Sequence, residues 1–171
     1  MPDQQKILKL IEQAAKEGWT ELDLSVKRLT NLPPEIAKLA NLTSLNLLAN
    51  DLTSLPPEIN KLTNLTCLDL KINQLTSLPP EITKLTNLTS LDIGFNELTS
   101  LPLEINKLTN LTSLNVDCNQ LTELAAENHQ ADQPDQPRRQ WKSLDEPAVG
   151  DYQARQPDQP LPKRKSITYP T

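Results

Sequence analysis

Apolar and polar positions follow one pattern along most of this chain, and the pattern recurs every 23 residues. The motif Leu-Thr-x-Leu-x-[Leu/Ile/Val]-x-x-Asn begins at Leu42, Leu65, Leu88 and Leu111. A weaker copy starts one period earlier at Trp19, with Lys27 in place of the asparagine. A fixed period of this length indicates a repeat architecture in which each copy is one structural unit. The array is therefore expected to cover residues 19–124 in about five copies.

The spacing within one copy predicts a short strand followed by a helical turn. Leu68 and Leu70 alternate with Asp69, so the carboxylate must point to the opposite face of the strand. Pro80 and Lys84 mark the start and end of a helical turn, because proline fits a first helical position and lysine suits a helix C-terminus. Each copy can bury its leucines only against a neighbour. The pattern thus predicts an α/β solenoid with parallel strands on the concave side and helical turns on the convex side.

An asparagine follows the predicted strand in each of the four clear copies. A side-chain amide both donates and accepts, so it can satisfy backbone groups that a turn leaves unpaired. Stacked copies would then form a structural ladder from Asn50, Asn73, Asn96 and Asn119. The Asn-Leu-Thr triplets at Asn41, Asn64, Asn87 and Asn110 match a glycosylation pattern, but they recur with the period and are interpreted as repeat consensus.

Residues 1–18 predict a helix that covers the first coil of the array. Its apolar side chains fall on one stripe formed by Ile7, Leu10, Ile11, Ala14 and Ala15. Gly18 is placed to end the helix. Charged residues interrupt the apolar run, which argues against a signal peptide, and no segment is long enough to span a membrane. A cytoplasmic location is therefore expected.

Residues 125–171 have a different character, because they are rich in proline and glutamine and lack a periodic apolar pattern. Composition alone predicts a disordered tail. However, Gln-Pro-Asp-Gln-Pro begins at both Gln133 and Gln156, again 23 residues apart. Codons for the segment from Ala131 to Pro137, read one base later, can encode Leu-Thr-Asn-Leu-Thr-Ser-Leu. We therefore predict that the reading frame slips just after Leu124 and that the tail is frame-shifted repeat sequence.

The sequence of the repeats resembles that of leucine-rich repeat proteins, particularly bacterial ones of cyanobacterial type. The resemblance rests on Leu-Pro-Pro-Glu-Ile-x-Lys-Leu-Thr-Asn-Leu-Thr-Ser-Leu, on Ile11-Glu-Gln-Ala-Ala15 and on Trp19-Thr-Glu-Leu-Asp-Leu24, and it covers residues 5–124. Similar arrays lie N-terminal to Roco-type GTPases. The resemblance implies protein binding without identifying a partner, since the same repeats accompany many functions.

Catalysis is not expected, and no cofactor is implied. The chain has three glycines, and none is placed to form a Gly-x-x-x-x-Gly-Lys-[Ser/Thr] phosphate-binding loop. His129 is the single histidine, so neither a Ser-His-Asp group nor a metal-ligand cluster is expected. Two cysteines, Cys67 and Cys118, do not form a disulfide framework.

Comparison of the copies within the chain suggests a binding face. The copies that begin at Leu42, Leu65 and Leu88 differ at eight of 23 positions, and six of these lie in the strand or just after it. Exposed convex positions such as Lys61, Lys84 and Lys107 have not diverged, although drift at unconstrained exposed sites remains the alternative. The candidate partner-binding residues on the concave face are Asp23, Val26, Asn46, Leu48, Ala49, Asp69, Lys71, Ile72, Asp92, Phe95, Asn115 and Asp117. Phe95 is the best anchor, because aromatic residues dominate binding hot spots.

The charge of the array indicates the kind of partner. Residues 1–128 contain 10 Lys and Arg against 16 Asp and Glu, which disfavours nucleic acid and anionic membranes. A protein partner with a basic and apolar surface is expected. Two alternatives stay open: a truncated remnant of a longer repeat protein, possibly of the Roco type, and a structural array that self-associates. An uncapped last coil, which includes Leu111, Leu114 and Leu121, would favour such self-association.

Overall fold

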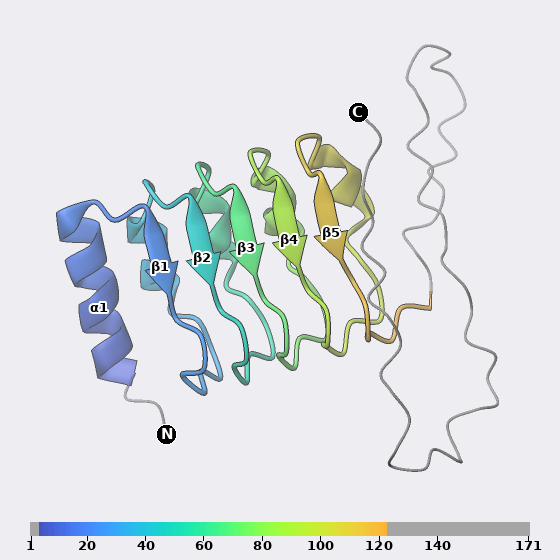
Figure 1. The fold of residues 1–171 in the computed structure, drawn as a ribbon, viewed down its shortest axis with the longest axis horizontal. Coiled ribbons are helices and arrows are strands. Elements are labelled where there is room, and N and C mark those ends of the chain that lie inside the picture. The colour runs from blue at the N-terminus through green and yellow to red at the C-terminus, as the bar shows by residue number, and fades with distance from the viewer. Residues whose placement is uncertain (1–3, 123–171) are drawn as a thin grey trace. The chain divides into compact units, whose positions relative to one another are not determined.

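The computed structural model describes residues 4–122 of the chain (Figure 1). One helix, α1 (Gln4–Glu17), precedes a sheet of five short strands and four helical turns. The strands are β1 (Glu21–Asp23), β2 (Ser44–Asn46), β3 (Cys67–Asp69), β4 (Ser90–Asp92) and β5 (Ser113–Asn115). The helical turns are η1 (Pro34–Lys38), η2 (Pro57–Lys61), η3 (Pro80–Lys84) and η4 (Leu103–Lys107). The predicted tail and the predicted frame slip fall on residues outside the described part.

The strands form one parallel sheet in the order β1-β2-β3-β4-β5. Each residue pairs with the residue 23 positions later, as Leu45 pairs with Leu68 and Leu68 with Leu91. Figure 1 shows the strands side by side in chain order, with the helical turns behind them. The register equals the sequence period, so the predicted solenoid of stacked coils is confirmed.

The core consists of equivalent apolar side chains from successive coils. In the coil that begins at Leu65, the inward residues are all buried: Leu65, Leu68, Leu70, Leu75, Leu78, Ile82 and Leu85. Full burial of one such side chain stabilises the folded protein by roughly 1.5–3 kcal/mol. That stabilisation depends on the adjacent coils, because a single coil has no other apolar surface to bury against.

The helical turns are 3₁₀ helices of five residues. In η2, the N–H of Ile59 donates to the Pro56 carbonyl over 3.0 Å, and the N–H of Leu62 donates to the Ile59 carbonyl over 3.1 Å. A segment this short closes more hydrogen bonds with three-residue spacing than an α-helix could, and proline at its start gives up no bonded N–H.

Each asparagine after a strand connects backbone groups of adjacent coils. Asn96 is buried, and its Oδ1 accepts the Leu75 N–H over 3.0 Å. Its Nδ2 donates to the carbonyls of Leu70 and Ile93, each over 3.0 Å. Asn50, Asn73 and Asn119 make equivalent bonds. These amides form hydrogen bonds with buried backbone groups where the chain leaves the sheet. Without such a partner, each buried N–H or carbonyl would destabilise the fold.

Two further ladders run along the array. The hydroxyls of Thr43, Thr66, Thr89 and Thr112 each donate to the carbonyl of the equivalent threonine one coil earlier, over 3.0 Å. The amides of Asn64, Asn87 and Asn110 donate to carbonyls of the preceding coil over 2.8–2.9 Å. The threonine and asparagine of three Asn-Leu-Thr triplets therefore have structural partners.

Helix α1 covers the first coil. Ile7, Ile11 and Ala14 are buried, and Leu10 and Ala15 pack partly against the same core. The helix ends at Gly18, whose φ of +67° is a conformation that glycine adopts without steric cost. A 3.6 Å ion pair between Lys38 and Glu12 joins η1 to the helix. Among residues 4–122, no helix is long and apolar enough to cross a bilayer.

The last described coil buries its apolar side chains less completely than the others. Leu111 and Leu114 are buried, but Val116 and Leu121 are only partly buried. The equivalent residues one coil earlier, Ile93 and Leu98, are fully buried. Self-association through this end stays a prediction.

Candidate interaction surface

The outward side of the sheet, which we call the strand face, carries most of the positions that differ between coils. Leu45 and Leu47 point into the core, whereas Ser44 and Asn46 are partly exposed on the other side. Three rows cross the strands on this face. We call them the carboxylate row (Asp23, Asn46, Asp69, Asp92 and Asn115), the middle row (Ser25, Leu48, Lys71, Gly94 and Asp117) and the apolar row (Val26, Ala49, Ile72, Phe95 and Cys118).

The carboxylate row has a structural role that the sequence analysis missed. In every coil, Oδ1 of the Asp or Asn accepts the backbone N–H two residues later, over 2.8–3.0 Å. This bond holds the chain where it leaves the strand. The signal was available, because Asp and Asn are the residues that form such turns and one of them occupies this position in all five coils.

The second carboxylate oxygen distinguishes Asp69 from Asp92. Oδ2 of Asp92 accepts a hydrogen bond from Asn115 Nδ2 over 3.1 Å. In the part of the chain that the structure describes, no hydrogen bond reaches Oδ2 of Asp69. This oxygen is therefore available to a donor from another molecule.

Within the carboxylate row, the pKa values of Asp69 and Asp23 shift in opposite directions. Burial raises the pKa of Asp69 and the nearby Asp92 carboxylate adds to this, although the Lys71 N–H and ammonium oppose it. Because the folded pKa is raised, charged Asp69 reduces stability at neutral pH, and the loss disappears as pH falls through the folded pKa. The Ser25 N–H lowers the pKa of the exposed Asp23.

The apolar row has an unusual backbone conformation. Its five residues have φ between 54° and 56°, in the left-handed region, and none is glycine. This region costs L-residues about 1–2 kcal/mol and is least favourable for β-branched side chains. Nevertheless Val26 and Ile72 occupy it with 70% and 48% of their surface exposed, and Phe95 is 50% exposed. The sequence indicated outward apolar side chains, but it gave no sign of the backbone conformation, and Cys118 was overlooked as the fifth member.

Two contacts in the middle row shape the surface around Phe95. Lys71 Nζ lies over the Phe95 ring, 5.4 Å from its centroid, in a cation–π contact. At Gly94, an added Cβ would lie 2.9 Å from Asn115 Nδ2 and 3.2 Å from Asp92 Oδ1. Gly94 therefore leaves the space in which the Asn115 amide reaches Asp92.

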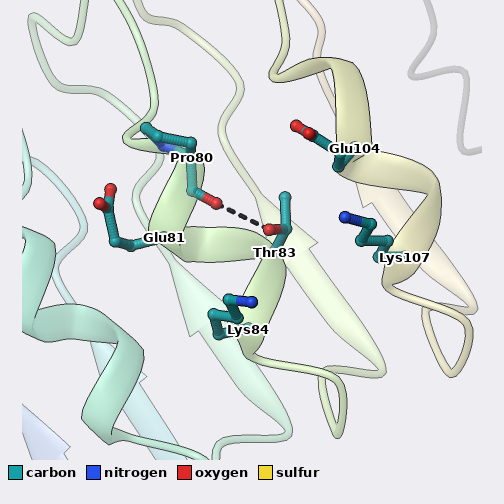
Figure 2. Close-up of a pocket in the computed structure, with 6 residues that line it drawn as sticks. All are labelled: Pro80, Glu81, Thr83, Lys84, Glu104 and Lys107. Atoms are coloured by element: carbon teal, nitrogen blue, oxygen red, sulfur yellow. Dashed lines mark hydrogen bonds between the residues drawn. The ribbon is translucent and has the colours of Figure 1, made fainter.

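A hollow lies on the opposite, helical side of the array (Figure 2). Pro80, Glu81, Thr83 and Lys84 of η3 line it together with Glu104 and Lys107 of η4. The Thr83 hydroxyl donates to the Pro80 carbonyl over 2.7 Å. The Glu and Lys that line this hollow recur in every helical turn, whereas the positions of Pro80 and Thr83 differ between turns.

The described residues contain two thiols and no cluster of metal-ligating side chains. No group of three or more His, Cys, Asp or Glu side chains among residues 4–122 could hold a metal ion. Cys67 is partly buried and Cys118 is exposed, and both are free. The strand face thus offers shape, charge and apolar surface.

A sequence profile described as "Leucine-rich repeat region" matches residues 21–129. The chain belongs to the leucine-rich repeat family. The comparison with curated proteins gave no match. A solved leucine-rich repeat structure matches this fold, in agreement with the stacked sheet and the helical turns described above.

A leucine-rich repeat protein of Leptospira interrogans is 45% identical to this leucine-rich repeat chain, with a TM-score of 0.59, over 60% of this chain and 26% of its own. The plant peptide hormone receptor RGFR1, in complex with RGF2, is 36% identical, with a TM-score of 0.51, over 53% and 15%. The internalin InlF of Listeria monocytogenes is 28% identical, with a TM-score of 0.56, over 65% and 32%.

These similarities cover less than a third of each matched protein's length. Two of the three proteins are bacterial, in loose agreement with the predicted bacterial type. The predicted similarity to arrays that precede Roco-type GTPases stays a prediction, as does the cytoplasmic location.

Proposed function

We propose that this chain is a non-catalytic protein-interaction module that binds its partner on the strand face, which corresponds to the predicted concave face. The apolar row carries the proposal. Ile72 and Phe95 are half exposed and have left-handed φ values, where an asparagine would be less strained and better solvated. Residues that reduce stability in this way are expected where another molecule covers them.

The distribution of differences between coils supports the same face. Positions of the middle and apolar rows vary from coil to coil, whereas the outward lysines of the helical turns do not. Variation concentrated on one face suits recognition of an irregular partner surface, whereas the Glu and Lys positions of the opposite face keep the consensus.

The proposed partner is a protein with basic and apolar surface. Asp23, Asp69 and Asp92 give the strand face acidic groups beside the apolar row, and complementary charge favours a basic partner. The same acidity disfavours nucleic acid and anionic lipid. Among the similar structures, RGFR1 is a receptor in complex with RGF2, which supports a binding role for repeats of this kind.

Affinity capture with a double variant tests the proposal. Phe95→Ala with Asp92→Asn removes the anchor ring and one charge, and both new residues occur at the same positions of the coil that begins at Leu42. The fold should therefore tolerate them. Loss of these two groups is expected to weaken capture at least about tenfold, since hot-spot residues each contribute about 2 kcal/mol or more.

The matched control is Leu103→Pro on the helical side. Leu103 is 62% exposed, and proline occupies its position in the three preceding coils. This variant should capture the same proteins as the wild type. Undiminished capture by the Phe95 and Asp92 double variant would refute binding on the strand face.

A further inference from the structure

The carboxylate row and the apolar row cross the strands in parallel, and this arrangement restricts the shape of a partner. Both rows advance by one residue per coil, because every strand pairs in the same 23-residue register. Neighbouring strands in a sheet lie about 4.8 Å apart. From Val26 to Phe95, and equally from Asp23 to Asp92, the rows therefore span about 14 Å.

A short extended peptide covers the same distance from end to end. It rises about 3.4 Å per residue, and its side chains alternate between two opposite sides. Three side chains on one side therefore belong to a stretch of five residues, and the first and third lie about 14 Å apart. A peptide lying flat across the strands would direct one set of side chains to the apolar row and the other set to the carboxylate row.

We propose that the strand face binds an extended segment of a partner protein in which apolar and basic residues alternate, lying across the strands. The inference rests on the proposed function and specifies its ligand. About six residues reach from the first coil to the fourth. The apolar side chains contact Val26, Ile72 and Phe95, and the basic side chains contact Asp23, Asp69 and Asp92.

Contacts within the chain show that this surface accommodates a cation. Lys71 Nζ lies 5.4 Å from the centroid of the Phe95 ring. Oδ2 of Asp69 receives no hydrogen bond from the described residues, and the Asp23 carboxylate is exposed. Guanidinium groups of a partner can bond to these oxygens in the planar geometry that carboxylates favour.

The side chains between the two rows disfavour a helical ligand. Leu48 and Lys71 of the middle row are partly exposed between the carboxylates and the apolar side chains. A helix that binds through one apolar stripe needs a hydrophobic groove. On the strand face, apolar and acidic groups lie on opposite sides of the middle row, which suits the two edges of an extended chain.

Binding of two peptides of equal composition to the full chain tests the inference. One is acetyl-Leu-Arg-Leu-Arg-Leu-Arg-amide, and the other is its block isomer acetyl-Leu-Leu-Leu-Arg-Arg-Arg-amide. Fluorescence anisotropy of labelled peptides measures both affinities. We expect the alternating peptide to bind at least about tenfold more tightly, because only it can satisfy both rows at once. Equal affinities would overturn the inference, since nonspecific charge attraction depends on composition alone.

Variants locate the bound peptide. Phe95→Ala and Asp69→Asn should each reduce the affinity for the alternating peptide toward that of the block isomer, whereas Leu103→Pro should leave it unchanged. Retained preference in both strand-face variants would place the peptide elsewhere and overturn the inference. If partner capture depends on Phe95 and Asp92 but the two peptides bind equally, the proposed function stands and only the extended ligand is refuted.

Discussion

At the scale of single residues, equivalent positions in different coils act as natural substitutions of one another. Asn60 and Thr83 occupy the same position in η2 and η3. Oδ1 of Asn60 is buried without a hydrogen bond, whereas the Thr83 hydroxyl donates to the Pro80 carbonyl over 2.7 Å. The asparagine therefore leaves a buried acceptor unsatisfied at a position where threonine has a partner.

Asn60→Thr is expected to stabilise the protein by about 1 kcal/mol, because an unsatisfied buried acceptor costs about 1–3 kcal/mol. The substitution lies on the helical side, away from the strand face, so partner capture should not change. Thermal denaturation measures the effect as a rise of a few degrees in Tm, in the range of about 2–8 °C per kcal/mol. Asn106→Thr, at the exposed equivalent in η4, is the control and should be neutral. An equal effect of both substitutions would contradict the explanation.

At the scale of elements, the asparagine ladder explains why the first coil departs from the consensus. Asn50 accepts the N–H groups of Lys27 and Leu29 and donates to the Leu24 carbonyl, so each asparagine serves the coil before its own. The first coil has α1, not another coil, on its N-terminal side. An asparagine at position 27 would lack these partners, and an exposed lysine occupies the position.

Asn73→Ala should destabilise the array by about 3–5 kcal/mol. The substitution leaves the Leu52 N–H and the carbonyls of Leu47 and Leu70 without this partner, and each buried loss costs about 1–3 kcal/mol, partly offset by relaxation. Urea denaturation measures the change. Asn119→Ala removes a similar set of bonds at a more exposed site and should cost less, so an equal or larger loss there would argue against burial as the cause.

At the scale of the whole described array, stability is transmitted between neighbouring coils. Helix α1 contacts η1, each helical turn contacts the next, and each strand contacts the next. Such arrays behave approximately as a one-dimensional chain of coupled units, so damage at one end should affect the nearest coils first.

Ile11→Ala tests this coupling. Ile11 is fully buried between α1 and the first coil, and truncation of such a side chain costs about 2–5 kcal/mol. Hydrogen exchange should then lose protection first in β1 and β2, with β4 changing least. The control is Leu10→Ala in the partly buried part of the same helix, which should have a smaller effect. Uniform loss of protection from β1 to β5 would show that the array unfolds as one unit.

The repeat period determined most of this architecture without tertiary information. A 23-residue spacing fixes which side chains point inward in every coil, and repetition of the same coil leaves parallel stacking as the way to bury them. The strands, the helical turns, the N-terminal helix and the asparagine positions therefore followed from the sequence. The outward direction of Phe95 and Ile72 was predicted from the variation between coils, whereas strict alternation after Leu70 and Ile93 would have turned both side chains inward.

Only the tertiary structure decided how the strand face is built. The left-handed backbone of the apolar row, the Lys71 contact with Phe95, and the approach of Asn115 to Gly94 all depend on the path of the chain as it leaves a strand or on contacts between coils. The sequence determined the coil because one repeat specifies its own inward set. The arrangement of the strand face could not be predicted from one repeat, because its rows exist only where side chains from different coils lie side by side.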